Sequence, residues 1–155
     1  MKLVGEGRMS REDNDLFFTC SLIDYISRKT RNVRSAVVNG LGRENIARIY
    51  DLADVYHCDN LDRVADDFIR ESDLTVGSFD NVGACLYSIP TIWDIGKVYM
   101  RLIRMVAAEE KRARVDVLMD VYNSFVSPLI DDYNSSFYYE NPGYIFECYR
   151  TGEVL

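Results

Sequence analysis

The sequence has few residues that could hold a metal ion or form disulfides. It contains one His and four Cys in 155 residues. The cysteines stand singly, without the short spacings that zinc ligands need; they are Cys20, Cys58, Cys85 and Cys148. The N-terminus has no apolar core typical of an export signal, so we expect free thiols rather than disulfides. We therefore predict no metal site and no cofactor.

Long hydrophobic runs are also missing. The longest stretch without a charged residue is Asn81 to Trp93, which is shorter than the roughly 20 residues that a membrane-spanning helix takes. We therefore predict a cytoplasmic protein without a membrane span. Hydrophobic residues make up 48% of the chain and aromatic residues 12%, which excludes a disordered protein. The length favours one domain, large enough for a sizeable core without staples.

Basic residues are outnumbered. The chain has 18 Lys and Arg against 25 Asp and Glu, for a net charge of −7. Acidic residues concentrate in 59–80 and 116–155, whereas 28–43 contains only basic charges. This balance opposes direct nucleic-acid binding, because phosphate contacts need a local excess of Lys and Arg. The acidic segments either form solvated faces or attract a basic partner.

Apolar spacing of three and four residues predicts an all-α fold, a compact bundle of six or seven helices. The first helix carries Leu16 to Ile26. Further helices are expected at 33–41, 44–56, 60–69, 91–106, 115–126 with an end at Pro128, and 141–152. Thr91 with Asp94 forms a capping box, and Asn141 before Pro142 is a typical helix start.

Turn-forming residues concentrate between two groups of helices, in the loop 74–90. We expect residues 1–10 to form a flexible tail and residues 11–155 a single helical domain. Within it, an N-terminal lobe over 11–73 and a C-terminal lobe over 91–155 would be joined by that loop. Cys85 to Ile89 is predicted to be a short extended piece.

Candidate catalytic groups are poorly arranged. His57 and Cys58 are neighbours and would diverge on a helix, so they do not form a dyad. The acidic pairs Asp66–Asp67 and Asp131–Asp132 come without a nucleophile or a phosphate-binding loop. We predict a protein that is not an enzyme and has no catalytic residues.

Tyrosines are abundant near the C-terminus, where they interleave with Asn, Ser and Gly. Tyr surrounded by small polar residues is typical of adaptable recognition surfaces. Such residues could equally seal the C-terminal segment onto the core. We take as candidate partner-binding residues Asp132, Tyr133, Asn134, Tyr138 and Tyr139. A separate alternative is a weak helix-turn-helix pattern over 28–48 that would bind DNA.

The N-terminal third resembles a known family. The residues that carry the resemblance are Asp15-Leu16-Phe17-Phe18, Leu22-Ile23-Asp24-Tyr25, Ile49-Tyr50-Asp51 and Tyr56-His57. Over residues 15–68 they look like a family of small helical proteins of gut Gram-positive bacteria, often encoded beside an ADP-ribosyltransferase-like toxin. The resemblance implies an antitoxin or accessory role and adds Tyr50, Tyr56 and His57 as candidate partner-binding residues.

Together these patterns predict a non-enzymatic, antitoxin-like interaction module that binds and restrains a partner protein, a toxin-like enzyme. The alternative is an acidic, nucleic-acid-mimicking inhibitor of a nuclease, of the anti-CRISPR type. The sequence leaves the oligomeric state open.

Overall fold

The computed structural model describes residues 9–155, and every regular element in that part of the chain is helical. The elements are α1 (Arg11–Thr30), α2 (Arg34–Asp51), α3 (Ala53–His57), α4 (Leu61–Glu71), α5 (Ile92–Glu110), α6 (Arg114–Tyr122), α7 (Val126–Ile130), the 3₁₀ turn η1 (Phe137–Tyr139) and α8 (Pro142–Thr151). The all-α prediction is confirmed. No helix within 9–155 is long and apolar enough to cross a membrane.

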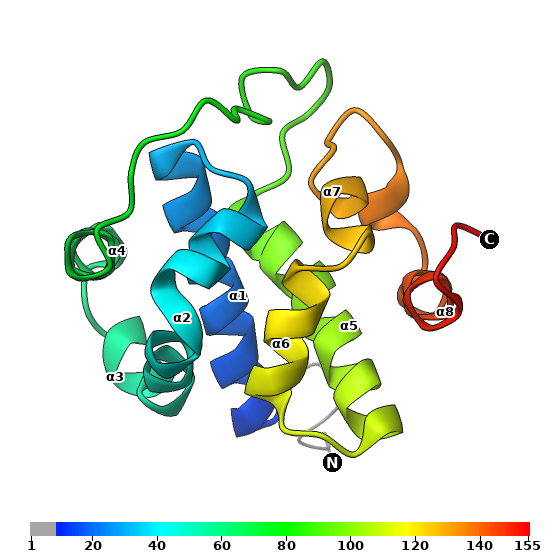
Figure 1. Ribbon diagram of the computed structural model, residues 1–155, viewed down its shortest axis with the longest axis horizontal. Coiled ribbons are helices and arrows are strands. Elements are labelled where there is room, and N and C mark those ends of the chain that lie inside the picture. The colour runs from blue at the N-terminus through cyan, green and yellow to red at the C-terminus, as the bar shows by residue number, and fades with distance from the viewer. Residues whose placement is uncertain (1–8) are drawn as a thin grey trace, which may run out of the picture.

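Helices α1 and α5 pack against each other in the middle of the molecule, with α3 and α4 at one end and α7 and α8 at the other (Figure 1). Residues 1–8 of the predicted tail lie outside the described residues. Ser10, which the prediction included in the tail, caps α1 instead: its Oγ accepts a hydrogen bond from the Asp13 N–H at 3.2 Å.

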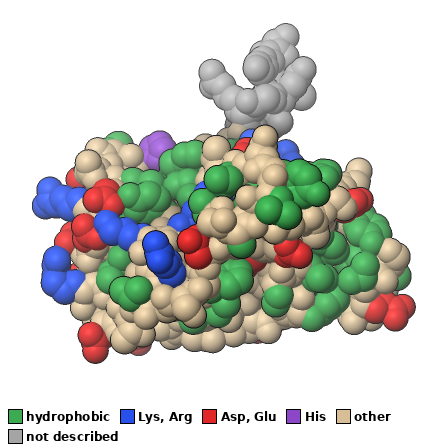
Figure 2. All heavy atoms as spheres, turned by 90° about the horizontal axis from the view of Figure 1, so that it is seen from above, with side chains coloured by type: hydrophobic (Ala, Val, Ile, Leu, Met, Phe, Trp, Pro, Cys, Tyr) green, Lys and Arg blue, Asp and Glu red, His purple; other side chains and the backbone are tan. Residues whose placement is uncertain are grey.

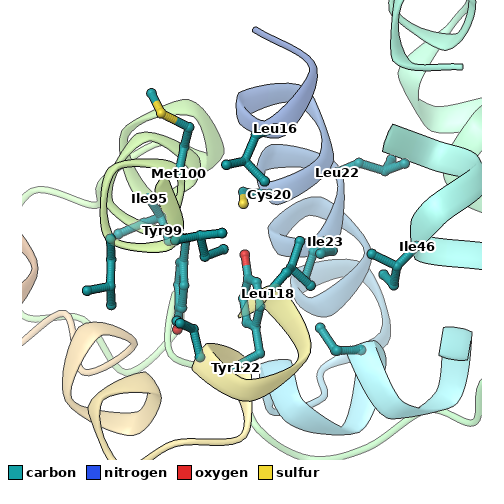
Figure 3. Close-up of a cluster of buried hydrophobic side chains, with 14 of the residues drawn as sticks. Leu16, Cys20, Leu22, Ile23, Ile46, Ile95, Tyr99, Met100, Leu118 and Tyr122 are labelled. Atoms are coloured by element: carbon teal, nitrogen blue, oxygen red, sulfur yellow. The ribbon is translucent and has the colours of Figure 1, made fainter. Parts of the chain in front are cut away.

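The buried apolar side chains form one cluster that takes members from both predicted lobes. Helix α1 packs more extensively against α5 than against any other element, so the core continues across the lobe boundary. At its centre the rings of Tyr99 and Tyr122 stack, with centroids 4.1 Å apart (Figure 3). The two central helices approach closely at Ser21 and Gly96, where a Cβ on Gly96 would overlap Ser21 Oγ and lie 3.0 Å from Ser21 Cα.

The helices predicted at 33–41 and 44–56 are divided differently in the structure. Helix α2 runs through both, with a kink at Gly42, whose φ of 80° and ψ of 161° are not helical. Glycine tolerates this backbone because it has no Cβ. The helix expected to reach Tyr56 ends at Asp51, and Leu52 separates it from the short α3. The helix predicted over 44–56 is therefore divided between the end of α2 and α3.

The predicted starts at Asn60, Thr91 and Asn141 are confirmed. Thr91 and Asp94 form the complete capping box, and the Asn141 side chain accepts from the Gly143 N–H. The predicted stop at Pro128 is wrong: α6 ends at Tyr122, and Pro128 lies in the first turn of α7. A proline is tolerated there because first-turn N–H groups have no partner within the helix.

The connection between α4 and α5 is irregular but held in place. The predicted extended piece at Cys85–Ile89 is wrong, since these residues form bends and coil, and residues 9–155 contain no strand for them to pair with. Earlier in the loop, the N–H groups of Gly77 and Phe79 donate to the carbonyls of Thr30 and Arg31 at the end of α1, both at 2.8 Å. These bonds fasten the loop across the α1 terminus.

Candidate functional site

The segment after α7 carries five of the eight predicted partner-binding residues, and it lines two neighbouring hollows. Asp132, Tyr133 and Asn134 line the first, and Tyr138 and Tyr139 line the second. The two hollows are linked through the rings of Tyr133 and Tyr138, whose centroids lie 5.9 Å apart. This part of the chain therefore forms the candidate site.

The other three predicted residues lie elsewhere. Tyr50 is half-buried on α2, and burial raises the pKa of its hydroxyl. Tyr56 packs its ring edge-on against Phe68 with centroids 5.5 Å apart. His57 is exposed at the end of α3, and its ring lies edge-on to that of Phe18 with centroids 5.7 Å apart. The structure does not bring these three together with the C-terminal tyrosines.

The first hollow, which we call the acidic cavity, has a volume of about 570 Å³. Its apolar and aromatic walls come from the start of α2, the loop before α5, the end of α6 and α7; they include Val33, Phe79, Ala84, Tyr122 and Pro128. Its polar groups include Arg34, Asp80, Asp131 and Asp132. An apolar hollow of this size with a few converging polar groups is the usual form of a binding site.

A buried charge network lies beneath the acidic cavity. Arg34 is only 1% exposed, and its Nε donates to Asp24 Oδ1 at 2.8 Å. Arg28 Nε donates to the other carboxylate oxygen of Asp24, also at 2.8 Å. Both arginines donate through Nη2 to the Tyr133 hydroxyl, at 3.0 Å from Arg34 and 3.1 Å from Arg28. The network ties α1 and α2 to the C-terminal segment and compensates the buried charges.

Tyr133 is therefore not a surface residue, although the sequence suggested one. It is 3% exposed, and burial raises the pKa of its hydroxyl to about 12, with Asp24 adding to the effect and Arg34 opposing it. At neutral pH the hydroxyl stays protonated and accepts from the two arginines. Its role within the fold is to join them.

Asp131 lies on the floor of the cavity and is 3% exposed. The hydroxyl of Tyr99 donates to its Oδ1 at 2.9 Å, and Arg34 Nε lies 4.0 Å from the same oxygen. Burial raises the pKa of this carboxyl to about 7; Arg34 opposes the rise and Asp24 adds to it. Asp131 consequently changes charge near neutral pH, which is typical of functional sites and also of buried structural networks.

Two exposed carboxylates stand among the residues that line the cavity. Asp80 Oδ1 accepts from the Gly83 N–H at 2.8 Å, and Asp132 Oδ1 accepts from the Asn134 N–H at 3.1 Å. Neither side chain has an ion-pair partner among residues 9–155. The basic residue lining the cavity, Arg34, already binds Asp24. The cavity therefore has an excess of negative charge.

The second hollow, which we call the tyrosine groove, has a volume of about 520 Å³. Apolar side chains of α5, α8 and the preceding loop line it; they are Ile89, Pro90, Val98, Leu102 and Ile145. Tyr139 stands beside them with 68% of its surface exposed, its ring edge-on to Tyr138 with centroids 4.9 Å apart. Charges of both signs also line the groove; they are Asp94, Lys97, Arg101 and Glu140.

Exposed apolar residues of the loop adjoin the tyrosine groove. We call Leu86, Tyr87 and Ile89 the loop patch; they expose 80%, 70% and 47% of their surfaces. The backbone beneath is held, since the Leu86 N–H donates to Asn134 Oδ1 at 2.7 Å and Asn134 Nδ2 donates to the Ala84 carbonyl at 3.0 Å. Figure 2 looks onto this side of the molecule, where hydrophobic side chains gather in patches and most Lys and Arg lie in the left half.

Many of the basic residues elsewhere are in ion pairs. The segments with an excess of one sign contribute the pairs Lys29 with Asp62 and Asp66, Arg43 with Asp116, Arg48 with Glu71, Arg70 with Asp67, Arg112 with Asp120, and Arg150 with Glu147. Within the basic segment, Arg28 and Arg34 turn inward to Asp24. Most of the basic charges that a DNA-binding surface over 28–48 would need are thus engaged within the protein.

The thiols and carboxylates do not gather into a metal centre in the described part of the chain, where no three His, Cys, Asp or Glu side chains are suitably grouped. All four cysteines are free, with Cys20 and Cys148 buried. Burial raises the pKa of the Cys20 thiol to about 12.

Sequence reasoning missed the most unusual groups, Asp24 and Arg34. Nothing in a linear pattern distinguishes Arg34 from its exposed neighbours, because its partner Tyr133 lies far along the chain. The loop patch had a visible signal: Leu86 and Tyr87 are large apolar residues inside a turn-rich loop. The sequence pattern predicts a short extended piece there instead of an exposed patch.

Comparison with protein-family models, with curated proteins and with solved structures finds no match to the chain. The family resemblance of residues 15–68 therefore stays a prediction.

Proposed function

We propose that this protein is a non-enzymatic interaction module that binds and restrains a partner enzyme, as an antitoxin does. The observation that carries the proposal is the loop patch. Leu86 and Tyr87 are largely exposed, although the Asn134 side chain holds the backbone at Ala84 and Leu86 by hydrogen bonds. Large apolar side chains on a held, exposed loop add nothing to the core and are typical of contact surfaces.

The tyrosine groove extends this surface. Ile89 belongs to the loop patch and also lines the groove, where Tyr139 stands largely exposed. Tyrosine offers a large contact area and loses little conformational entropy when it is fixed by a partner. A partner segment seated on the patch would therefore reach Tyr139 as well.

The charge of the chain favours a basic partner. The net charge is −7, and the carboxylates of Asp80 and Asp132 beside the acidic cavity have no cation within residues 9–155. Opposite charges across an interface accelerate encounter and select the partner. The partner would then present an apolar surface with basic residues at its edge.

The alternative of a nucleic-acid mimic has less support. It needs a continuous face of unmatched acids, but the acids of α4 are engaged with Lys29, Arg48 and Arg70. Direct DNA binding has less support for the same reason, since four of the five basic residues within 28–43 are in ion pairs.

The proposal is tested by affinity capture from a lysate of the source organism, followed by an activity assay of the captured enzyme. The double variant Leu86→Ser/Tyr87→Ser is compared with wild type, and Val76→Ser, 78% exposed in the same loop, is the matched control. We expect wild type and the control to capture the same enzyme stoichiometrically and to inhibit it. The double variant should do neither.

Two results would contradict the proposal. One is undiminished capture of the same enzyme by the double variant. The other is an enzyme whose activity is unchanged at saturating wild-type protein.

A further inference from the structure

The acidic cavity has apolar walls that suit the hydrocarbon stem of a ligand. Its walls are formed by Val33, Phe79, Ala84 and Pro128, so a hydrocarbon chain entering it would lose contact with water. Its volume of about 570 Å³ falls in the range of ligand-binding pockets. The buried network under it fixes Asp131 and Tyr133, so the lining is rigid on that side.

The carboxylates of the cavity favour a ligand that carries a positive charge at the end of its apolar stem. Asp80 and Asp132 each use Oδ1 for a backbone N–H, and their Oδ2 atoms accept no hydrogen bond from the described chain. Arg34 does not serve them, because its Nε donates to Asp24, its Nη2 to the Tyr133 hydroxyl and its Nη1 to the Asn32 carbonyl. A cation from outside would therefore be the natural counter-ion for these carboxylates.

Asp131 adds a third carboxyl at the floor. The charged and titratable groups that face it are Asp24 of α1, Arg34 of α2, Tyr99 of α5 and Tyr133 of its own segment. An entering cation would favour the ionised form of Asp131 and lower the pKa that burial has raised. Binding should consequently strengthen as the pH rises through about 7.

We propose that the acidic cavity binds the guanidinium group of an Arg side chain that the partner protein inserts. A guanidinium is planar, is weakly hydrated and carries several N–H donors, so it can serve separated carboxylates while its faces contact aromatic rings such as Phe79. The inference deepens the proposed function and rests on it, because it names the group of the partner that the cavity receives.

The experiment is an NMR titration of the full ¹⁵N-labelled chain with N-acetyl-arginine amide. The matched probe is N-acetyl-citrulline amide, which has nearly the same shape and no charge. We expect saturable shifts of the cavity amides, including Ser35, Asn81 and Ser124, with the arginine probe and at least fivefold weaker binding of citrulline, about the effect of one partly exposed charge.

Variants of the cavity carboxylates test which charges bind the arginine probe. Asp80→Asn and Asp132→Asn keep the oxygen that accepts the backbone N–H and should each weaken the arginine probe about threefold to fivefold. Asp59→Asn is the matched control: Asp59 is also exposed, and its Oδ1 also accepts from a backbone N–H, that of Asn60, at 2.7 Å. The control should bind the probe as wild type does.

The inference is overturned if citrulline binds equally well, if a lysine probe binds as tightly as arginine, if both cavity variants bind normally, or if no shift appears at concentrations where a millimolar Kd would show. Its failure is distinct from that of the proposed function. If the arginine probe does not bind but partner capture still depends on Leu86 and Tyr87, only the proposed role of the cavity is refuted. If the probe binds in a charge-dependent way but the captured enzyme is not inhibited, only the proposed restraining function is refuted.

Discussion

Replacing Asp131 by Asn should make the protein more stable at neutral and alkaline pH while leaving it nearly unchanged in acid. The carboxyl is buried, accepts from the Tyr99 hydroxyl and lies 3.4 Å from Ser127 Oγ. An asparagine keeps the oxygen for Tyr99 and offers an N–H₂ to Ser127, so the substitution removes the charge and preserves the contacts.

The magnitude follows from the pKa of Asp131 in the two states. The ordinary value is 3.8 in the unfolded chain, and burial raises it to about 7 in the folded one. Between these values the folded state binds a proton that the unfolded state has released, so the free energy of unfolding falls as pH rises from about 4 to about 7 and then levels off. At about 1.4 kcal/mol per pH unit, the loss is about 4 kcal/mol.

Urea denaturation of wild type and Asp131→Asn at several pH values between about 4 and 8 measures this difference. The variant should gain about 4 kcal/mol relative to wild type across that range. Asp132→Asn makes the same chemical change one residue along, on an exposed side chain, and serves as the control. A difference between Asp131→Asn and wild type that does not vary with pH would refute the reasoning.

Three further substitutions test other parts of the fold, each by chemical denaturation. Gly96→Ala should destabilise by roughly 1–3 kcal/mol, since its Cβ would overlap Ser21 Oγ; an unchanged midpoint would mean that α1 and α5 are not so close. Thr91→Ala removes half of the capping box and should cost about 1 kcal/mol, and no loss would argue against that cap. Arg34→Met should cost roughly 3–5 kcal/mol, because Asp24 loses a buried partner; a neutral or stabilising effect would show that Asp24 takes up its proton or is compensated by Arg28 alone.

The sequence predicted those parts of the fold whose causes are local. The capping box at Thr91 and the Asn141–Pro142 start depend on residues within one helical turn, and both are present in the structure. The errors came where tertiary packing outweighs the local pattern. Pro128 lies in the first turn of α7, whereas the sequence predicts that it ends a helix. Leu52 interrupts an apolar repeat that looks continuous in the sequence.

The candidate site was predictable only as a segment. The richness in Tyr, Asn and Asp pointed to residues around 132–139, which do line the two hollows. Their division between buried and exposed could not be foreseen, because it depends on Arg34, which reaches Tyr133 from a distant helix. The resemblance to the helical family added Tyr50, Tyr56 and His57, which lie on other parts of the surface.

The packing of α1 against α5 has a consequence for the order in which the chain is made. The apolar face of α1 is synthesised well before its main partner α5, which is complete only at Glu110. At ~5–20 residues per second, the nascent chain carries that face without its partner for several seconds. During this interval α1 can make only its lesser contacts, with α2, α3 and α4, so the newborn protein should depend on chaperones. Slow translation of α5 should then lower the yield of folded protein more than equally slow translation of α8.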